Sequence, residues 1–179
     1  ISPLVKNDSL RVHLISDLLD NLQGLTLDMR LTDFSGKVWK KESRKVDLPA
    51  NSSHEVFGST TAYWKSAKDL TECYLLITLK NSKKQPVAQS VCYFVPTKDL
   101  KLPETKIRRK VKYSDGSYTI TLSSPKLAKD VFIEIPVQGA RFSDNFFDLL
   151  PGEKRVITIE SPRFTGDEEI AVRHIRDTY

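Results

Sequence analysis

A strict alternation of apolar and polar side chains is the feature that most limits what this chain can fold into. The clearest example is residues 25–32, where every second residue is apolar: Leu25, Leu27, Met29 and Leu31. Successive side chains of a β-strand point to opposite faces, so this pattern predicts a strand with one buried face. Residues 10–14 and 118–123 repeat the same period, and no stretch sustains a helical one. The chain is therefore expected to be all-β, built from half-buried antiparallel strands.

Turn and linker signals divide this strand-rich chain into two parts. Asp33-Phe34-Ser35-Gly36 and Ser114-Asp115-Gly116 predict hairpin turns, because Asp and Gly favour the tight turns between antiparallel strands. Pro96 and Pro103 bracket charged residues, a composition typical of an extended linker. The length of 179 residues suits two domains of about 90 residues each. We therefore predict two tandem β-sandwich domains, residues 1–96 and residues 97–179.

The alternation and the turn signals also predict individual strands. Expected strands in the first part cover residues 10–14, 25–32, 37–40 and beyond, 53–57, 73–79 and 87–95. Expected strands in the second part cover residues 107–113, 117–123, 130–135, 155–160 and 169–175. Short helical turns are expected only at residues 18–22 and 65–70.

The net charge of +5 raises the question of a nucleic-acid partner. The one dense basic run, residues 106–112, places its lysines on one strand face, which is typical of an exposed strand guarded by lysine. Arg109 falls on the opposite, apolar face, and a bulge there is the alternative. No nucleic-acid-binding motif accompanies the run, so no nucleic-acid partner is predicted.

No apolar run approaches the roughly 20 residues that a membrane span needs, and no membrane span is predicted. The chain begins Ile1-Ser2-Pro3, without an initiator Met or the regions of a signal peptide. We interpret it as a piece of a longer protein or a processed product. Its localisation stays open.

The chain carries no motif for a cofactor, a nucleotide or a catalytic nucleophile, and no cofactor is predicted. His13, His54 and His174 lack metal-ligand spacing, so surface positions and no metal site are expected. Asp144, Asp148 and Glu153 are clustered, but an Asp in a loop usually bonds its own backbone. We therefore expect these carboxylates to shape turns and assign no catalytic residue.

Two cysteines, Cys73 and Cys92, lie in neighbouring apolar runs. If those runs form a hairpin, the two residues come near each other across it. A cross-strand disulfide and a pair of buried thiols both remain open.

Aromatic residues supply the one binding hypothesis. A stacking platform for sugar rings would draw on Trp39, Tyr63, Trp64, Tyr74 and Tyr93. Large aromatics also anchor sandwich cores and domain junctions, and that alternative applies to all five. Tyr63 and Trp64 are the best candidates for exposure, and they are the predicted sugar-binding residues.

Two regions of the chain resemble β-mannosidases, enzymes of glycoside hydrolase family 2. Residues 10–19 and 25–31, followed by the turn at 33–36, resemble the sandwich that follows the catalytic barrel in that family. The more specific match is Ser143-Asp144-Asn145-Phe146-Phe147-Asp148-Leu149-Leu150-Pro151-Gly152-Glu153, which resembles the C-terminal immunoglobulin-like domain. The resemblance implies two tandem immunoglobulin-like domains from the C-terminal region of a β-mannosidase.

The family hydrolyses terminal, non-reducing β-D-mannose residues by a retaining mechanism that uses two Glu residues on a (β/α)₈ barrel. Such a barrel needs about 250 residues, so the resemblance implies an accessory region that is inactive alone. The implied partners are the catalytic barrel and N-terminal domains of the same polypeptide, together with mannose-containing glycans. The implied localisation is periplasmic or secreted in a bacterium and lysosomal in a eukaryote. Two alternatives stay open: a carbohydrate-binding module that grips mannan, and an adhesion- or receptor-type sandwich.

Overall fold

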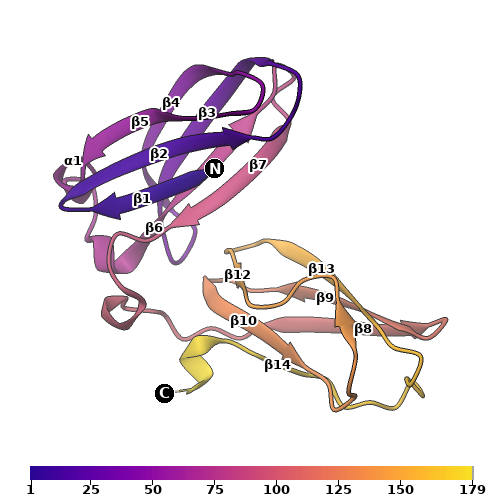
Figure 1. The fold of residues 1–179 in the computed structure, drawn as a ribbon. Coiled ribbons are helices and arrows are strands. Elements are labelled where there is room, and N and C mark those ends of the chain that lie inside the picture. Colours follow the sequence, from indigo (N-terminus) through magenta and orange to yellow (C-terminus); the bar gives the residue numbers. More distant parts are fainter. Residues whose placement is uncertain (179) are drawn as a thin grey trace. The chain divides into compact units, whose positions relative to one another are not determined.

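The computed structural model describes residues 1–178 and is built from β-strands in two compact units (Figure 1). Unit 1 comprises Ile1–Asp33 and Lys37–Lys101, and unit 2 comprises Phe34–Gly36 and the chain from Leu102 onward. Each unit is a two-sheet antiparallel sandwich, so the predicted all-β fold class is confirmed. The predicted domain boundary after residue 96 and the unit division after Lys101 differ by residues 97–101.

Unit 1 packs a sheet of three strands against a sheet of four. The first sheet has the order β1-β2-β5, formed by β1 (Ser2–Lys6), β2 (Ser9–Ser16) and β5 (Ser52–Thr60). The second has the order β4-β3-β6-β7, formed by β4 (Val38–Leu48), β3 (Leu22–Asp33), β6 (Cys73–Lys80) and β7 (Pro86–Cys92). All pairings are antiparallel.

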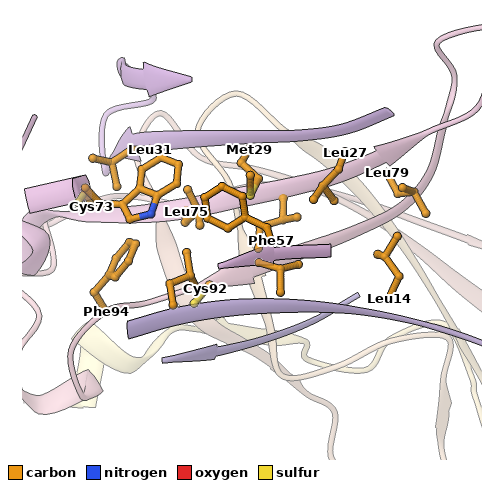
Figure 2. Close-up of a cluster of buried hydrophobic side chains, with 14 of the residues drawn as sticks. Leu14, Leu27, Met29, Leu31, Phe57, Cys73, Leu75, Leu79, Cys92 and Phe94 are labelled. Atoms are coloured by element: carbon orange, nitrogen blue, oxygen red, sulfur yellow. The ribbon is translucent and has the colours of Figure 1, made fainter. Parts of the chain in front are cut away.

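The alternation in the sequence becomes the core of unit 1. Leu27, Met29 and Leu31 of β3 are fully buried, while the residues between them are half-buried. Figure 2 shows them among Leu75 of β6 and Phe57 of β5, which also belong to the core cluster. Removing this apolar surface from water is the main favourable contribution to the stability of unit 1, at about 25 cal/mol per Å² buried.

Unit 2 is built on the same plan. One sheet has the order β12-β10-β14, formed by β12 (Phe147–Leu149), β10 (Ala128–Glu134) and β14 (Ala171–Arg173). The other has the order β11-β13-β9-β8, formed by β11 (Arg141–Phe142), β13 (Lys154–Glu160), β9 (Ser117–Ser123) and β8 (Arg108–Ser114). β8 pairs with β9 in continuous register, so the alternative of a bulge at Arg109 is wrong.

The core of unit 2 again comes from every second residue. Tyr118, Ile120 and Leu122 of β9 are buried, and Ile157 and Ile159 of β13 lie in the same cluster. No residue of unit 1 belongs to this cluster, so each unit has a hydrophobic core of its own.

Short helical turns lie between the strands and after the last strand. In the described part of the chain they are α1 (Thr61–Lys65) and three 3₁₀ turns, η1 (Leu70–Glu72), η2 (Thr97–Asp99) and η3 (Ile175–Thr178). The helical turn predicted at residues 18–22 is wrong, because bends occupy this segment and Leu22 begins β3. Of the segment 65–70, for which a helical turn was predicted, only the two end residues belong to helices: Lys65 ends α1 and Leu70 begins η1. Within residues 1–178, no helix is long and apolar enough to span a bilayer.

Candidate functional site

The predicted sugar-binding pair lies where β5 turns into α1. The Thr60 hydroxyl accepts a hydrogen bond from the Tyr63 amide, which caps the first turn of α1. Trp64 is 0% exposed, and its indole Nε1 donates to Ser59 Oγ at 3.0 Å. Its ring centroid lies 6.1 Å from that of Phe57, a core residue. The expectation that Trp64 is exposed is therefore wrong: its ring is part of the core of unit 1.

Tyr63 differs from its neighbour because its side chain is 39% exposed. Its hydroxyl donates to Glu42 Oε2 at 2.8 Å, and this bond raises the pKa of the phenol above its ordinary value. The ammonium of Lys40 lies 3.2 Å from the centroid of the Tyr63 ring and donates to the Tyr63 carbonyl. A sugar would therefore have to meet the other face of this ring. Sugar contact at Tyr63 stays a prediction.

The remaining aromatics do not make one exposed platform with this pair. Tyr74 is only 2% exposed. Trp39 is 41% exposed, with Nε1 donating to Asp33 Oδ2 at 2.8 Å and the Lys37 ammonium 4.1 Å from its ring centroid. Tyr93 is half-buried. The two exposed rings of the five, Trp39 and Tyr63, are therefore separate, each beside a lysine.

The carboxylates of Asp144 and Asp148 accept hydrogen bonds from a guanidinium and from a backbone amide. Asp144 Oδ2 accepts from the Arg155 guanidinium at 2.7 Å. Asp148 Oδ1 accepts from the amide of Asp130 at 2.9 Å. Asp130 has a positive φ of 50° where the register between β10 and β12 shifts, so Asp148 fastens an irregular point of the sheet. Both carboxylates thus make structural bonds.

The turn before β13 uses the third carboxylate in the same way. Gly152 has a φ of 76°, a conformation that glycine adopts without strain, as the Pro-Gly pair predicted. Glu153 Oε2 accepts from the Leu150 amide at 3.0 Å and so closes this turn. The prediction that these acids shape turns holds for Glu153, whereas Asp148 binds an irregular point of β10 and Asp144 pairs with Arg155.

Asn145 has a role that sequence reasoning missed. Its Oδ1 accepts from the Ile133 amide at 2.8 Å, and its Nδ2 donates to the Ile133 carbonyl at 3.1 Å. One amide side chain thereby pairs with β10 as a strand would. Phe146, which follows, is 72% exposed and stacks on Phe132, whereas Phe147 is buried. Two successive apolar residues suggest two core anchors, but only Phe147 lies in the core.

The two cysteines are free thiols buried in unit 1 (Figure 2). Cys92 lies opposite Leu75 across the β6–β7 pairing, so Cys73 does not face it directly. Burial raises the pKa of the Cys73 thiol to about 12 and that of Cys92 to about 11. Both are therefore protonated at neutral pH and are poor nucleophiles.

The histidines do not form a metal site. His174 is 3% exposed, against the expectation of a surface position, and its Nδ1 has no hydrogen-bond partner within residues 1–178. Among those residues, no group of three or more His, Cys, Asp or Glu could hold a metal ion. His174 borders an open groove of about 680 Å³ in unit 2, which is also lined by Glu104, Thr105, Lys106, Pro125, Lys126, Arg176 and Asp177. Its charges are of both signs, so they select no class of ligand.

Comparisons with known proteins match both units. The family model "Mannosidase Ig/CBM-like domain" matches residues 8–99, and the model "Ig-fold domain" found in mannosidases matches residues 102–178. A β-D-mannosidase structure from Dictyoglomus thermophilum is 23% identical, with a TM-score of 0.71, over 97% of this chain and 21% of that one. An exo-chitosanase structure from Amycolatopsis orientalis is 17% identical, with a TM-score of 0.58, over 96% of this chain and 25% of that one.

At these identities the solved structures bear on the fold alone. The chain spans about a fifth to a quarter of their lengths. The comparison with curated proteins finds no match. The family models match in the order that the resemblance to β-mannosidases predicted, with only residues 100–101 between them. The chain therefore belongs to the mannosidase Ig/CBM-like domain family and continues into the Ig-fold domain that accompanies it in β-mannosidase-like proteins of glycoside hydrolase family 2.

Proposed function

We propose that this chain is the C-terminal accessory region of a β-mannosidase that hydrolyses terminal, non-reducing β-D-mannose residues by a retaining mechanism, and that the chain itself is not catalytic. The observation that carries the proposal is the matched order of the two family models over nearly the whole chain. The engagement of Asp144, Asp148 and Glu153 in turns and ion pairs agrees with it. A carboxylate that holds a backbone amide is not free to act as an acid or a nucleophile on a sugar.

In this proposal the two sandwiches brace the catalytic barrel and the N-terminal domains of the same polypeptide. Each sandwich has its own hydrophobic core, so each can hold its shape as a rigid support. The solved relatives are four to five times longer than the part that this chain covers, which leaves room for a barrel of about 250 residues.

A chromogenic β-mannoside tests the catalytic half of the proposal. The purified chain should give no turnover above a buffer blank, while the longer polypeptide that contains it should hydrolyse the substrate. Turnover by the chain alone would overturn the non-catalytic assignment. If the longer polypeptide instead cleaves a β-glucosaminide in preference to the mannoside, the mannosidase assignment is wrong.

The bracing role needs a separate measurement. Deleting residues 1–179 from the longer polypeptide should lower the melting temperature of the barrel, read by differential scanning calorimetry. An unchanged barrel transition would contradict bracing even if the substrate assignment holds.

The second candidate function is a carbohydrate-binding module that grips mannan through Tyr63. The partial exposure of this ring favours it, since one aromatic face beside a polar rim suits the apolar face of a sugar. Titration calorimetry with mannooligosaccharides distinguishes the two functions, because a support should give no saturable heat. If binding is found, Tyr63→Ala should abolish it. Trp39→Ala, which removes an equally exposed ring elsewhere in unit 1, should leave it unchanged.

A further inference from the structure

The outer face of β8 and its neighbours in unit 2 is mostly basic; its one acid, Glu160, lies at the turn end of β13, opposite Arg141 of β11. Arg108, Lys110 and Lys112 are exposed and share one face of β8. The register continues this face across the sheet through Ser123, Thr121 and Thr119 of β9 to Lys154, Val156 and Thr158 of β13. Within residues 1–178, Arg108, Lys110, Lys112 and Lys154 form no ion pair. We call the row Arg108, Lys110 and Lys112 the basic row.

The backbone of β8 is also open. β8 is the last strand of its sheet, so only one of its two sides is paired. The hairpin turn at Asp115 and Gly116 has positive φ angles of 53° and 74°, the geometry of a two-residue type I′ turn. Ser114 and Ser117 beside this turn then form a hydrogen-bonded pair, and such pairs alternate along the ladder. The amides of Arg109, Val111 and Tyr113 therefore point away from β9.

Nothing in the described chain occupies those outward amides. Among residues 1–178, β8 makes no backbone hydrogen bond outside its ladder with β9. The opposite face of the strand is anchored: the Arg109 guanidinium donates to the Ile170 carbonyl, and the Tyr113 hydroxyl donates to the Phe164 carbonyl at 3.2 Å. β8 is thus already ordered, which lowers the entropic cost of adding a partner.

The basic edge of unit 1 offers an internal comparison. β4 is also an edge strand rich in lysine and arginine, and such residues normally discourage pairing with other chains. There, however, three of the four cations have partners within unit 1: Lys40 lies over Tyr63, Arg44 lies 3.9 Å from Glu42, and Lys45 donates to Thr26. The basic row of β8 lacks such partners. Protection of the sheet edge therefore explains these charges less completely than partners within the unit explain those of β4.

We propose that the edge of β8 accepts an extended acidic peptide segment from another protein as an additional strand. Residues two apart on a strand are about 6.6–6.8 Å apart in both partners, so carboxylates at alternate positions would fall opposite the basic row. The outward amides of β8 would supply the backbone hydrogen bonds of β-strand addition. This inference is independent of the proposed β-mannosidase activity.

Two other occupants fit the face less well. A second copy of this chain is not the occupant, because no edge strand among the described residues carries acids at successive alternate positions. Single-stranded nucleic acid binds through aromatic stacking as well as charge. The side chains beside the basic row are the hydroxyls of Thr119, Thr121 and Ser123, with no exposed ring among them.

The test uses the whole chain and a synthetic peptide in which Glu alternates with Thr. A peptide of the same composition with its Glu residues contiguous is the first control, and an alternating peptide with N-methylated amides is the second. We expect saturable binding of the alternating peptide, together with slowed amide hydrogen exchange at Arg109, Val111 and Tyr113. Both control peptides should bind much more weakly and should not slow this exchange.

Substitutions locate the site. Each cross-strand ion pair that is lost should weaken binding by about 1.5-fold to 5-fold, and the charge reversal Lys110→Glu should exceed this range. The matched control is Lys41→Glu, which makes the same charge change on the exposed side of β4 in unit 1. It should leave binding within error of the parent chain. The thermal transition of unit 2 checks that Lys110→Glu remains folded, and the N-methylated peptide tests the same contacts without altering the protein.

Several results would overturn the proposal. Absence of saturable binding at low salt would mean that the basic row only guards the edge. Equal binding of the contiguous-acid peptide, without amide protection, would mean unspecific charge attraction. Tighter binding of a single-stranded oligonucleotide or an anionic polysaccharide than of the alternating peptide would assign the face to a different class of partner.

Discussion

Replacing Trp64 by alanine separates a core role from a sugar-binding role. A tryptophan buries about 150–250 Å² of surface, which at about 25 cal/mol per Å² corresponds to about 4–6 kcal/mol. Substitutions of buried tryptophan by alanine cost about 3–5 kcal/mol, and the lost hydrogen bond to Ser59 contributes about 1 kcal/mol. We therefore expect Trp64→Ala to lower the unfolding free energy of unit 1 by about 4–5 kcal/mol, a large share of the roughly 5–15 kcal/mol typical of a domain.

The chain provides its own optical probe for this measurement. Its two tryptophans, Trp39 and Trp64, both belong to unit 1, so tryptophan fluorescence follows the unfolding of unit 1 alone. With an m-value of about 2 kcal/mol per M, the urea midpoint should fall by about 2 M in Trp64→Ala, with Trp39 as the remaining reporter. Trp64→Phe keeps most of the ring and loses the indole donor, so its midpoint should fall by about 1 M or less.

The matched control is Tyr63→Ala, which removes the partly exposed ring next in sequence and should shift the midpoint much less. An unchanged midpoint in Trp64→Ala, combined with loss of mannooligosaccharide binding, would refute the core assignment. Loss of stability without any effect of Tyr63→Ala on sugar binding would remove the remaining reason to place a glycan at this corner.

Three other groups give shorter tests. The Glu168 carboxylate accepts a hydrogen bond from the Tyr118 hydroxyl, which lowers its pKa from 4.5 to about 2. Its contribution to stability is therefore present above about pH 4.5 and is lost as the pH falls toward 2, so Glu168→Gln should flatten the acid dependence of the melting temperature of unit 2 over this window. Asn145→Ala leaves a backbone amide and carbonyl of β10 without partners and should destabilise unit 2 by about 1–3 kcal/mol in urea unfolding; no change would show that water replaces the side chain. Cys73 and Cys92 should react slowly with a thiol reagent in the native chain and rapidly in denaturant, whereas a chain that shows no thiols after denaturation would contain a disulfide.

Much of the fold could be predicted because the strands follow a local rule. The alternation in residues 25–32 reflects one buried face, and β3 buries Leu25, Leu27, Met29 and Leu31 accordingly. The Asp115-Gly116 pair predicted a hairpin because few residues other than glycine take positive φ without strain, and the turn has that geometry. The short strands β11 and β12 were missed, because two or three residues are too few to show a period.

The burial and the partners of single side chains depend on residues that are distant in the sequence. Trp64 is buried because Phe57 and Phe94 converge on it from other segments, and nothing in its immediate neighbours distinguishes it from exposed Tyr63. Arg109 looked misplaced on an apolar strand face. Its guanidinium reaches a carbonyl sixty-one residues later in the chain, a partner that the pattern around residue 109 cannot reveal.

The two basic edge strands show most clearly what the sequence cannot predict, and their difference bears on function. By composition, β4 and β8 are the same kind of strand: basic, at the edge of a sheet and rich in lysine. From the sequence, edge protection is predicted for the run at residues 106–112 only, but the same role would fit the composition of β4, since it requires only the presence of cations. Their difference lies in what surrounds them. Lys40 and Arg44 of β4 are beside the Tyr63 ring and Glu42, while the basic row of β8 faces hydroxyl groups and solvent. An unpaired cation attracts an anion at any time, whereas a paired one must first give up its partner. If one of these two edges binds an acidic segment, the structure therefore points to β8, and a comparison of Lys110→Glu with Lys41→Glu tests that choice directly.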